Sequence, residues 1–208
     1  MKICYIFAAA EGEPKNFAPK KDDLVIAADA GFLKLEQYGV SPHIVLGDFD
    51  SMQEIPEANE IIRHPVKKDD TDTMLAVKTG FERGYKLFVI YGGTGGRLDH
   101  TLANLQTLSF IASKGGTGFL CGDDFTATAL RDSTIHFSEK ATGNISVFSA
   151  TSECKVSIKG LLYNLENKTL THSFPLGVSN EFIGEKSEIS ISGGTAFILW
   201  SENLEFLL

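Results

Sequence analysis

The amino-acid sequence predicts two domains, an α/β domain with a mostly parallel, Rossmann-like sheet and a small all-β sandwich that follows it. Over the first part of the chain, apolar runs typical of strands alternate with segments of helical periodicity. This is the pattern of a parallel sheet connected by helices. Further on, short runs rich in β-branched and aromatic residues follow one another, separated by turn residues. We therefore expect an α/β domain over residues 1–125 and a β domain over residues 126–208.

The α/β domain is expected to alternate strands with helices. The strand candidates are residues 2–9, 24–28, 43–46, 60–64, 86–91 and 117–121. Apolar residues recur at helical spacing in two sets, Met74, Val77 and Phe81, then Leu98, Leu102, Leu105, Leu108 and Ile111. Residues 87–90 are continuously apolar, as expected where helices cover both faces of a sheet. Ligands of such sheets bind at the carboxyl ends of the strands.

The β domain is expected to be built from short strands joined by turns. The strand candidates are residues 133–137, 145–148, 155–158, 188–191 and 195–200. Turn residues separate them, as at Thr142-Gly143-Asn144 and Gly193-Gly194. A sandwich of about 80 residues is close to the size at which a lone core becomes marginal. We therefore expect contacts with the α/β domain or with a second subunit to stabilise this domain.

Composition favours a cytoplasmic protein with no nucleic-acid partner and no membrane partner. The 208 residues carry a formal net charge of −8, whereas phosphate backbones need clustered lysine and arginine. No apolar stretch approaches the roughly 20 residues needed to span a membrane. The apolar run after Lys2 resembles a signal peptide, but Glu11 and Glu13 follow at once, which favours a buried strand. The 3 cysteines lack metal-site spacing and are expected to be reduced thiols.

Acidic residues follow the ends of several predicted strands. Asp48 and Asp50 lie in a Gly-Asp-Phe-Asp-Ser segment after one strand candidate, and Asp29 follows another. The carboxyl ends of parallel strands meet at one edge of a sheet, where gathered carboxylates repel one another unless a hard divalent cation lies between them. The alternatives are a turn closed by Asp48 and Asp50 and a helix cap at Asp29.

A second acidic cluster, Asp69, Asp70 and Asp72, precedes the first helical pattern. Thr71 or Asp70 could simply cap that helix, and aspartate is favourable near a helix N-terminus in any case. A cap does not need three acids within four residues. We therefore assign a functional role to Asp72 before Asp69 or Asp70.

A glycine-rich segment follows the strand candidate at 86–91. It consists of Gly92, Gly93, Thr94, Gly95 and Gly96, and it leads into Arg97, Asp99 and His100 at a helix start. Such a loop lets backbone N–H groups approach phosphate oxygens, and arginine can bind phosphate through two donors. Asp99 could hold a metal or orient Arg97, and His100 could contact phosphate or cap the helix. The segment is neither a Walker A loop nor a dinucleotide fingerprint, because the Gly-Lys-Ser/Thr and the spacing are missing.

In the β domain, Ser179 and Asn180 lie in a polar stretch between apolar residues, at 177–181. A hairpin turn is the simpler explanation of such a stretch. A binding role is the alternative.

Taken together, these motifs resemble those of the thiamine pyrophosphokinase family of the bacterial type. The matching segments are GDFDS at 47–51, KDDTD at 68–72, GGRLDH at 95–100 and SNE at 179–181. Residues 29–31 and 160–165 add to the resemblance, which covers essentially the whole chain. The loop after the first strand departs from it, because the family usually has a glycine-rich turn where this chain has Ala8-Ala9-Ala10-Glu11-Gly12-Glu13-Pro14.

The resemblance implies an enzyme that converts ATP and thiamine into AMP and thiamine diphosphate. It also implies a homodimer whose active site lies between the α/β domain of one subunit and the β domain of the other. By the same resemblance Asp48, Asp50 and Asp72 would bind Mg²⁺, with Asp29 nearby.

The resemblance also assigns the substrate contacts. Arg97 and the loop 92–96 would hold the triphosphate of ATP, with support from Asp99. Ser179 and Asn180 of a second subunit would contact thiamine. Two other functions stay open at this point, a different Mg²⁺-dependent phosphoryl transferase acting on a small alcohol and a non-catalytic thiamine- or nucleotide-binding regulator. Either Asp48 or Asp72 could be the general base.

Overall fold

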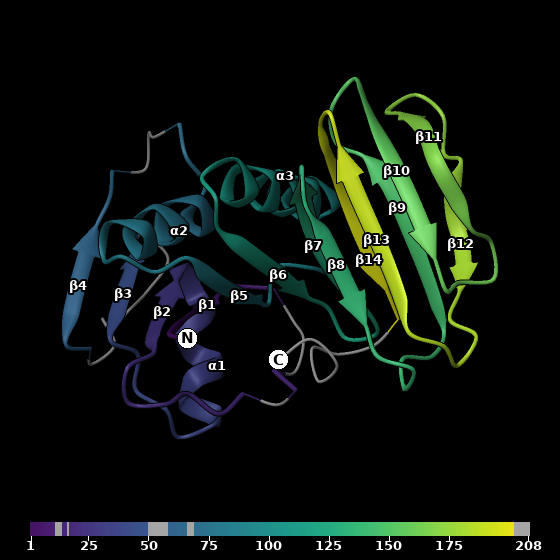
Figure 1. Cartoon of the computed structure of the whole chain (residues 1–208). Coiled ribbons are helices and arrows are strands. Elements are labelled where there is room, and N and C mark those ends of the chain that lie inside the picture. The colour runs from purple at the N-terminus through teal and green to yellow at the C-terminus, as the bar shows by residue number, and fades with distance from the viewer. Residues whose placement is uncertain (11–13, 16, 50–57, 66–68, 202–208) are drawn as a thin grey trace. The chain divides into compact units, whose positions relative to one another are not determined.

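The structure, a computed structural model, describes residues 1–10, 14–15, 17–49, 58–65 and 69–201. The chain divides into two compact units (Figure 1). Unit 1 comprises residues 1–107 and 120–122, and unit 2 comprises residues 108–119 and 123–208. Helix α3 (Leu98–Ser113) and strand β6 (Thr117–Cys121) contribute residues to both. The domain boundary that we place at residue 125 stays a prediction.

Unit 1 contains a parallel sheet, as predicted. Its strands are β1 (Ile3–Phe7), β2 (Leu24–Ala28), β3 (Ile44–Gly47), β4 (Glu60–Arg63) and β5 (Leu87–Tyr91). They lie in the order β4-β3-β2-β1-β5, and each neighbouring pair is parallel. Ile6 of β1 pairs with Ile26 on one side and Ile90 on the other, and all three are fully buried. Continuous burial of this kind is expected where both faces of a sheet are covered.

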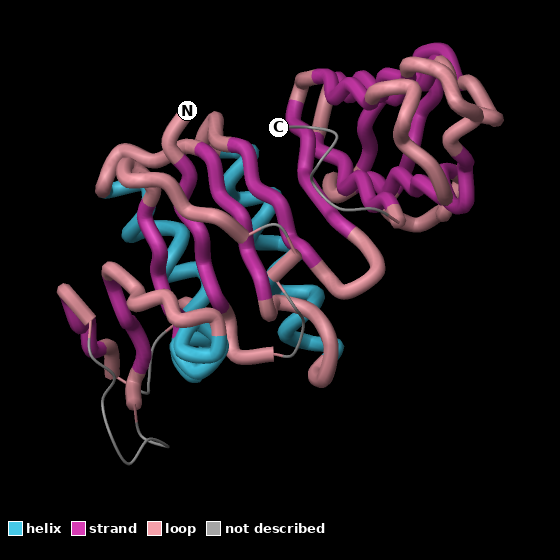
Figure 2. Tube along the Cα trace, turned by 90° about the horizontal axis from the view of Figure 1, so that it is seen from below, coloured by secondary structure: helices cyan, strands magenta, loops and turns pink. Residues whose placement is uncertain are grey.

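Helices cover the two faces of this sheet. The short η1 (Asp29–Gly31) leads into α1 (Phe32–Gln37), which packs on β1 and β2. Helix α2 (Asp72–Glu82) packs on β1, β2 and β3 from the opposite face (Figures 1 and 2). Thr71 caps α2, since its side chain accepts a hydrogen bond from the backbone N–H of Met74 at 3.2 Å.

The apolar pattern of α3 is buried only in part. Leu108 and Ile111 are buried as predicted, whereas Leu98 and Leu102 in the first two turns are 72% and 54% exposed. Helical periodicity identifies an apolar face but not what covers it. The first turns of α3 therefore present an apolar surface to solvent.

Unit 2 is all-β apart from its share of α3, as predicted. Its strands are β7 (Thr126–Arg131), β8 (Thr134–Phe137), β9 (Asn144–Ser149), β10 (Glu153–Lys159), β11 (Leu165–Thr171), β12 (Gly177–Glu181), β13 (Ser187–Ser192) and β14 (Thr195–Trp200). They form two layers, β12-β9-β14-β7 and β11-β10-β13-β8, with antiparallel pairing in each.

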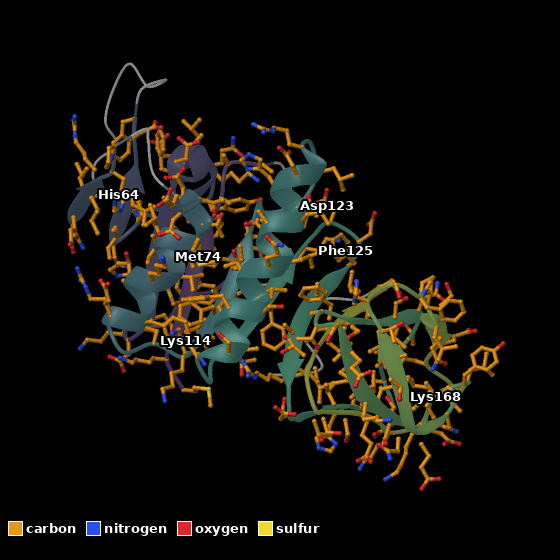
Figure 3. The ribbon with its side chains drawn as sticks, turned by 90° about the horizontal axis from the view of Figure 1, so that it is seen from above. His64, Met74, Lys114, Asp123, Phe125 and Lys168 are labelled. Atoms are coloured by element: carbon orange, nitrogen blue, oxygen red, sulfur yellow. The ribbon has the colours of Figure 1, made fainter. Side chains whose placement is uncertain are left out.

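The two layers of unit 2 pack face to face. Strand β10 contacts β14, and β11 contacts β9. Alternate residues of β10 point inward and are buried, as in other sandwiches. The ring of Phe137 meets those of Phe182 and Trp200 edge-on, at centroid distances of 5.1 and 5.4 Å. Lys168 of β11 lies on the outer surface (Figure 3).

Two further expectations concern the whole chain. None of the described helices is both long and apolar enough to cross a membrane. The three cysteines form no disulfide, and Cys4 and Cys154 are buried. Burial raises the pKa of the Cys4 thiol, so this side chain is a core residue and not a nucleophile.

A close approach of α2 to the sheet depends on Gly80. A Cβ at Gly80 would lie 2.6 Å from Cε1 of Phe88 and 3.0 Å from Sγ of Cys4. In a helix interior, alanine is more favourable than glycine by about 1 kcal/mol. Overpacking a core, however, costs about 1–3 kcal/mol. We therefore expect Gly80→Ala to lower the free energy of unfolding in urea. The exposed Glu82→Ala in the same helix should change it by less than ~0.5 kcal/mol. A stabilised Gly80→Ala protein would show that α2 can move away from the sheet.

Candidate active site

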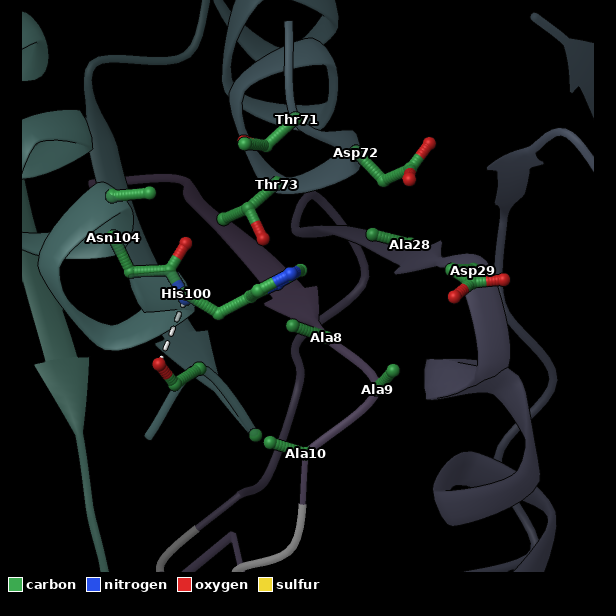
Figure 4. Close-up of a pocket in the computed structure, with 13 residues that line it drawn as sticks. Ala8, Ala9, Ala10, Ala28, Asp29, Thr71, Asp72, Thr73, His100 and Asn104 are labelled. Atoms are coloured by element: carbon green, nitrogen blue, oxygen red, sulfur yellow. Dashed lines mark hydrogen bonds between the residues drawn. The ribbon is translucent and has the colours of Figure 1, made fainter. Parts of the chain in front are cut away.

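The candidate site is a pocket at the carboxyl ends of the parallel strands. The chain passes from β1 to β2 on one side and later adds β5 on the other, so the strand order reverses between β1 and β5. Such a reversal is where α/β sheets bind ligands. The pocket, about 610 Å³ including the open space at its mouth, is lined by segments from five places (Figure 4). They are Ala8–Ala10, Ala28–Asp29, Thr71–Thr73, Gly92–Gly93, and His100 with Ala103 and Asn104.

The three acids at the start of α2 have different surroundings in the structure. Asp70 forms an ion pair with Lys78 at 2.6 Å, and Asp69 is exposed. Asp72 is half-buried in the first turn of α2 and lines the pocket. Capping and surface pairing therefore account for Thr71 and Asp70, and they leave Asp72 as the acid that faces the candidate site.

Asp29 lies at the end of β2 and also lines the pocket. Figure 4 shows the carboxylates of Asp29 and Asp72 on the side of the pocket away from Asn104. The next strand end adjoins them, because a Cβ at Gly47 would lie 3.3 Å from Cα of Asp29. The turn that contains Asp48 therefore begins against the backbone of Asp29.

Two non-glycine residues at these strand ends have left-handed backbone conformations. Asp29 has φ +52°, and the buried Phe49 has φ +59°. Each such residue costs about 1–3 kcal/mol, and this strain concentrates at functional sites. The Arg63 guanidinium lies 5.9 Å from the ring centroid of Phe49, within the range of a cation–π contact. The packing around Phe49 thus holds the Gly47–Phe49 turn in a strained backbone conformation.

The predicted metal ligands are not all within the described part of the chain. Asp50 lies outside the described residues. Among the residues that are described, no three His, Cys, Asp or Glu side chains gather as a metal-binding group. The set Asp48, Asp50 and Asp72 therefore stays a prediction.

The turn after β5 packs tightly against the loop after β1. The backbone N–H groups of Ala8 and Ala10 donate to the carbonyls of Tyr91 and Gly92, at 2.8 and 2.9 Å. Gly92 has φ +64°, and a Cβ there would meet the carbonyl oxygens of both Ala8 and Ala10. Only glycine fits this position, because L side chains are disfavoured at this φ and there is no space for one.

The rest of the glycine-rich segment differs along its length. Thr94 is buried, whereas Gly95 and Gly96 have φ +85° and +65° with open space around them. Asn104 in α3 donates from Nδ2 to the Gly93 carbonyl at 2.7 Å (Figure 4). The first half of the segment is thus part of the pocket wall, and the second half is exposed.

Arg97 and Asp99 bind each other at the surface. Arg97 donates from Nη2 and Nε to the two carboxylate oxygens of Asp99, at 2.6 and 3.1 Å. This pair raises the pKa of Arg97 and lowers that of Asp99, chiefly through the side-chain hydrogen bond. The backbone N–H of His100 also donates to Asp99, at 3.0 Å. His100 lines the pocket. The carboxylate of Asp99 binds Arg97, and the functional roles of both residues stay predictions.

In unit 2, Asn180 holds a neighbouring segment in place. Its Oδ1 accepts from the backbone N–H of Tyr163 at 2.9 Å, and its Nδ2 donates to the Tyr163 carbonyl at 2.7 Å. Ser179 is exposed and has φ +59°, next to an irregularity in the pairing of β12 with β9. The stretch 177–181 is therefore an edge strand rather than a hairpin turn.

Exposed apolar side chains gather in the same part of unit 2. We define the unit 2 apolar surface as Leu162, Tyr163, Phe174, Leu176, Val178 and Ile183, which are 42–65% exposed. The backbone N–H of Leu162 donates to the Glu181 carbonyl at 3.0 Å, so these two segments are neighbours. Exposed apolar side chains on neighbouring segments make this part of unit 2 a candidate interaction surface.

Comparison with known proteins gives the family. The model for the thiamin pyrophosphokinase catalytic domain matches residues 18–116, and that for the thiamin pyrophosphokinase vitamin B1 binding domain matches residues 132–195. The chain belongs to the thiamine pyrophosphokinase family.

Relatives from distant organisms support this family assignment along the whole chain. Thiamine pyrophosphokinase of Bacillus subtilis is 28% identical over 205 residues, which cover 91% of this chain and 95% of the relative. Thiamin pyrophosphokinase 1 of Caenorhabditis elegans is 27% identical over 219 residues, covering 95% and 89%. The crystal structure of a thiamin pyrophosphokinase family protein from Enterococcus faecalis superposes with a TM-score of 0.82 at 25% identity, covering 98% of this chain and all of that one.

Within this thiamine pyrophosphokinase fold, three polar residues that the sequence analysis does not identify adjoin the site. Asn104 is buried in α3, and its side chain donates to the Gly93 carbonyl. Lys34 of α1 donates to the Ala10 carbonyl. His64 follows β4 (Figure 3). Its backbone N–H donates to the Gly47 carbonyl at 3.1 Å. Its Nε2 is buried and makes no hydrogen bond within the described part of the chain. No local sequence pattern indicates these three residues, because each of them contacts a backbone carbonyl that is distant in the sequence.

Proposed function

We propose that this protein transfers the pyrophosphoryl group of ATP to the hydroxyl of thiamine, giving thiamine diphosphate and AMP. The observation that carries the proposal is the match of both family domains, catalytic and vitamin B1 binding, in sequence order on one chain. The pocket adds support, because Asp29, Asp72 and the Gly92 turn line it at the strand-order reversal. That reversal also supports a Rossmann-like origin for the sheet of unit 1.

The proposed reaction needs positioning and charge stabilisation more than covalent help. The thiamine hydroxyl oxygen bonds to the β-phosphorus of ATP. The bond from that phosphorus to the oxygen it shares with the α-phosphorus breaks, and AMP leaves with that oxygen. The hydroxyl proton goes to a carboxylate, for which Asp48 and Asp72 are the candidates.

We propose that Asp48, Asp50 and Asp72 hold Mg²⁺, with Asp29 beside them. Carboxylate oxygens are the ligands that this hard cation takes, and the donor types at these strand ends therefore fit it. When bound, the ion neutralises charge on the phosphate oxygens. The strained turn at Gly47–Phe49 would present Asp48 at the same edge as Asp29.

The phosphates of ATP would lie along the turn after β5. Backbone N–H groups of the Gly92–Gly96 segment can approach phosphate oxygens closely. Arg97 would supply two donors, held ready by its pairing with Asp99. His100 lines the pocket and would contact the nucleotide.

We propose that the protein is a cytoplasmic homodimer in which Ser179 and Asn180 of a second copy contact thiamine. Two exposed apolar surfaces support this, the first turns of α3 and the unit 2 apolar surface. The bonds from Asn180 to Tyr163 suggest that it also shapes this surface.

A product assay tests the proposed function. The protein is incubated with ATP, Mg²⁺ and thiamine, and nucleotides and thiamine esters are separated by chromatography. AMP and thiamine diphosphate in equal amounts are expected. ADP with thiamine monophosphate would replace the proposal with single phosphoryl transfer. Thiamine binding without any product would indicate a regulator.

Mixing two inactive variants tests the shared site. Asp72→Asn and Asn180→Ala would each be inactive as homodimers, because every site would contain one altered residue. After the two proteins are mixed and re-dimerised, mixed dimers have one site with both residues intact. We expect partial recovery of activity, up to about a quarter of the wild-type rate for random pairing. Absence of recovery, with mixed dimers shown by mass spectrometry, would contradict the shared site.

A further inference from the structure

Lys34 connects α1 to the loop after β1. It lies half-buried in α1, and its ammonium group donates to the Ala10 carbonyl. Ala10 lines the pocket, and Lys34 reaches it from a position 24 residues later in the chain. A hydrogen bond from a charged donor is about twice as strong as a neutral one. This contact therefore ties the pocket wall to the helix beneath it.

The same ammonium group adjoins the turn after β5. A Cβ at Gly92 would lie 2.9 Å from Nζ of Lys34 and 2.8 Å from the carbonyl oxygen of Ala10. The ammonium and the two alanine carbonyls thus surround Gly92. The backbone bond from Ala10 to Gly92 lies at the same place. Lys34 of α1 thus lies against both the Ala8–Ala10 loop and the β5 turn.

The chemistry of the loop explains why such a tie is needed. Residues 8–10 are three alanines, whose methyl side chains offer no hydrogen bonds of their own. The ammonium group of Lys34 supplies the side-chain hydrogen bond that these alanines cannot make, and it does so at the carbonyl of Ala10, in the wall of the pocket.

We propose that Lys34 is a positioning residue of the nucleotide site. It holds the Ala8–Ala10 loop against Gly92, in the arrangement that receives the phosphates of ATP. The inference rests on the proposed function for the identity of the ligand, but the tie itself rests on contacts within the chain. Loss of the ammonium should raise the KM for ATP about tenfold or more, with little change in kcat or in the KM for thiamine.

The variant Lys34→Met tests this, because methionine keeps an unbranched stem and removes the charge. The matched control is Lys86→Met. Lys86 is exposed and immediately precedes the first residue of β5, at the end of the strand away from the pocket. Steady-state kinetics give both KM values and kcat. Hydrogen exchange of residues 8–10 is followed with and without the ATP analogue that has a methylene group between its α- and β-phosphorus. We expect faster exchange at Ala10 in Lys34→Met, a weakened response to the analogue, and wild-type behaviour in the control.

Chemical rescue separates charge from fold. Lys34→Cys treated with 2-bromoethylamine regains an ammonium at nearly the original distance, and treated wild-type protein controls for the native cysteines. Recovery of both the ATP KM and the slow exchange supports the proposal. A normal ATP KM in Lys34→Met overturns it, and so does a raised KM with unchanged exchange, because Lys34 would then act on ATP directly. If the wild-type protein makes no AMP, the proposed function fails, while exchange and analogue binding still decide the role of Lys34.

Discussion

Asp72→Asn should lower kcat by about 10²- to 10³-fold while the protein keeps its fold. This is the effect of removing one group that stabilises charge in a transition state. Asparagine keeps the shape of the side chain in the first turn of α2, and Thr71 still caps the helix. The lost interaction with the helix dipole is worth about 0.3–1 kcal/mol. The melting temperature should therefore fall by less than about 3 °C.

Asp70→Asn is the matched control for this variant. Asp70 lies two residues before Asp72, and its partner is Lys78 at the surface. A partly exposed pair of this kind contributes little to stability, so both kcat and melting temperature should stay near wild type. Equal loss of activity in the two variants would show that turnover depends on the total negative charge at the start of α2 rather than on Asp72 itself. We expect Asp50→Asn to behave like Asp72→Asn, although Asp50 lies outside the described residues.

Gly92→Ala should damage both stability and nucleotide binding. A left-handed residue other than glycine costs about 1–2 kcal/mol. The added methyl group would also meet the carbonyl oxygens of Ala8 and Ala10, and such overpacking adds about 1–3 kcal/mol. We expect the free energy of unfolding to fall by roughly 3 kcal/mol. Displacement of the loop by even ~1 Å should lower kcat/KM for ATP about 10²-fold.

Gly39→Ala separates backbone strain from the clash. Gly39 has nearly the same φ, +65°, but a Cβ there would meet no atom within 4 Å. It should cost about 1–2 kcal/mol and leave kcat/KM unchanged. If Gly92→Ala were no worse than Gly39→Ala in urea unfolding and in kcat/KM for ATP, the close approach of the two loops would not matter for function.

The two-part architecture could be predicted because the hydrophobic periods differ between the two parts. The parallel strands β1, β2, β3 and β5 are continuous apolar runs, and these are the clearest signals in the chain. Strands β7, β11 and β12 were not predicted. β7 alternates threonine with alanine at Thr126–Ala129, and β12 begins with glycine and carries three polar residues. Such segments become strands because the neighbouring strands β14 and β9 offer them pairing.

The site could be predicted only where chemistry follows directly from position in the chain. Asp29 directly follows strand β2, and Asp72 begins helix α2. The sequence therefore places both near strand ends, and both line the pocket. Lys34 and Asn104 act on backbone carbonyls 24 and 11 residues away. No local pattern encodes such contacts, because they exist only once the helices have packed on the sheet. The same holds for Asn180, whose side-chain amide forms hydrogen bonds with the backbone of Tyr163, 17 residues away.

The fate of the β-phosphorus tests the central claim most directly. ATP radiolabelled at the β-phosphorus would be incubated with the protein, Mg²⁺ and thiamine, and the products separated. Pyrophosphoryl transfer predicts label in thiamine diphosphate, at the phosphorus bonded to the thiamine oxygen, and unlabelled AMP. Label in ADP together with unlabelled thiamine monophosphate would contradict pyrophosphoryl transfer.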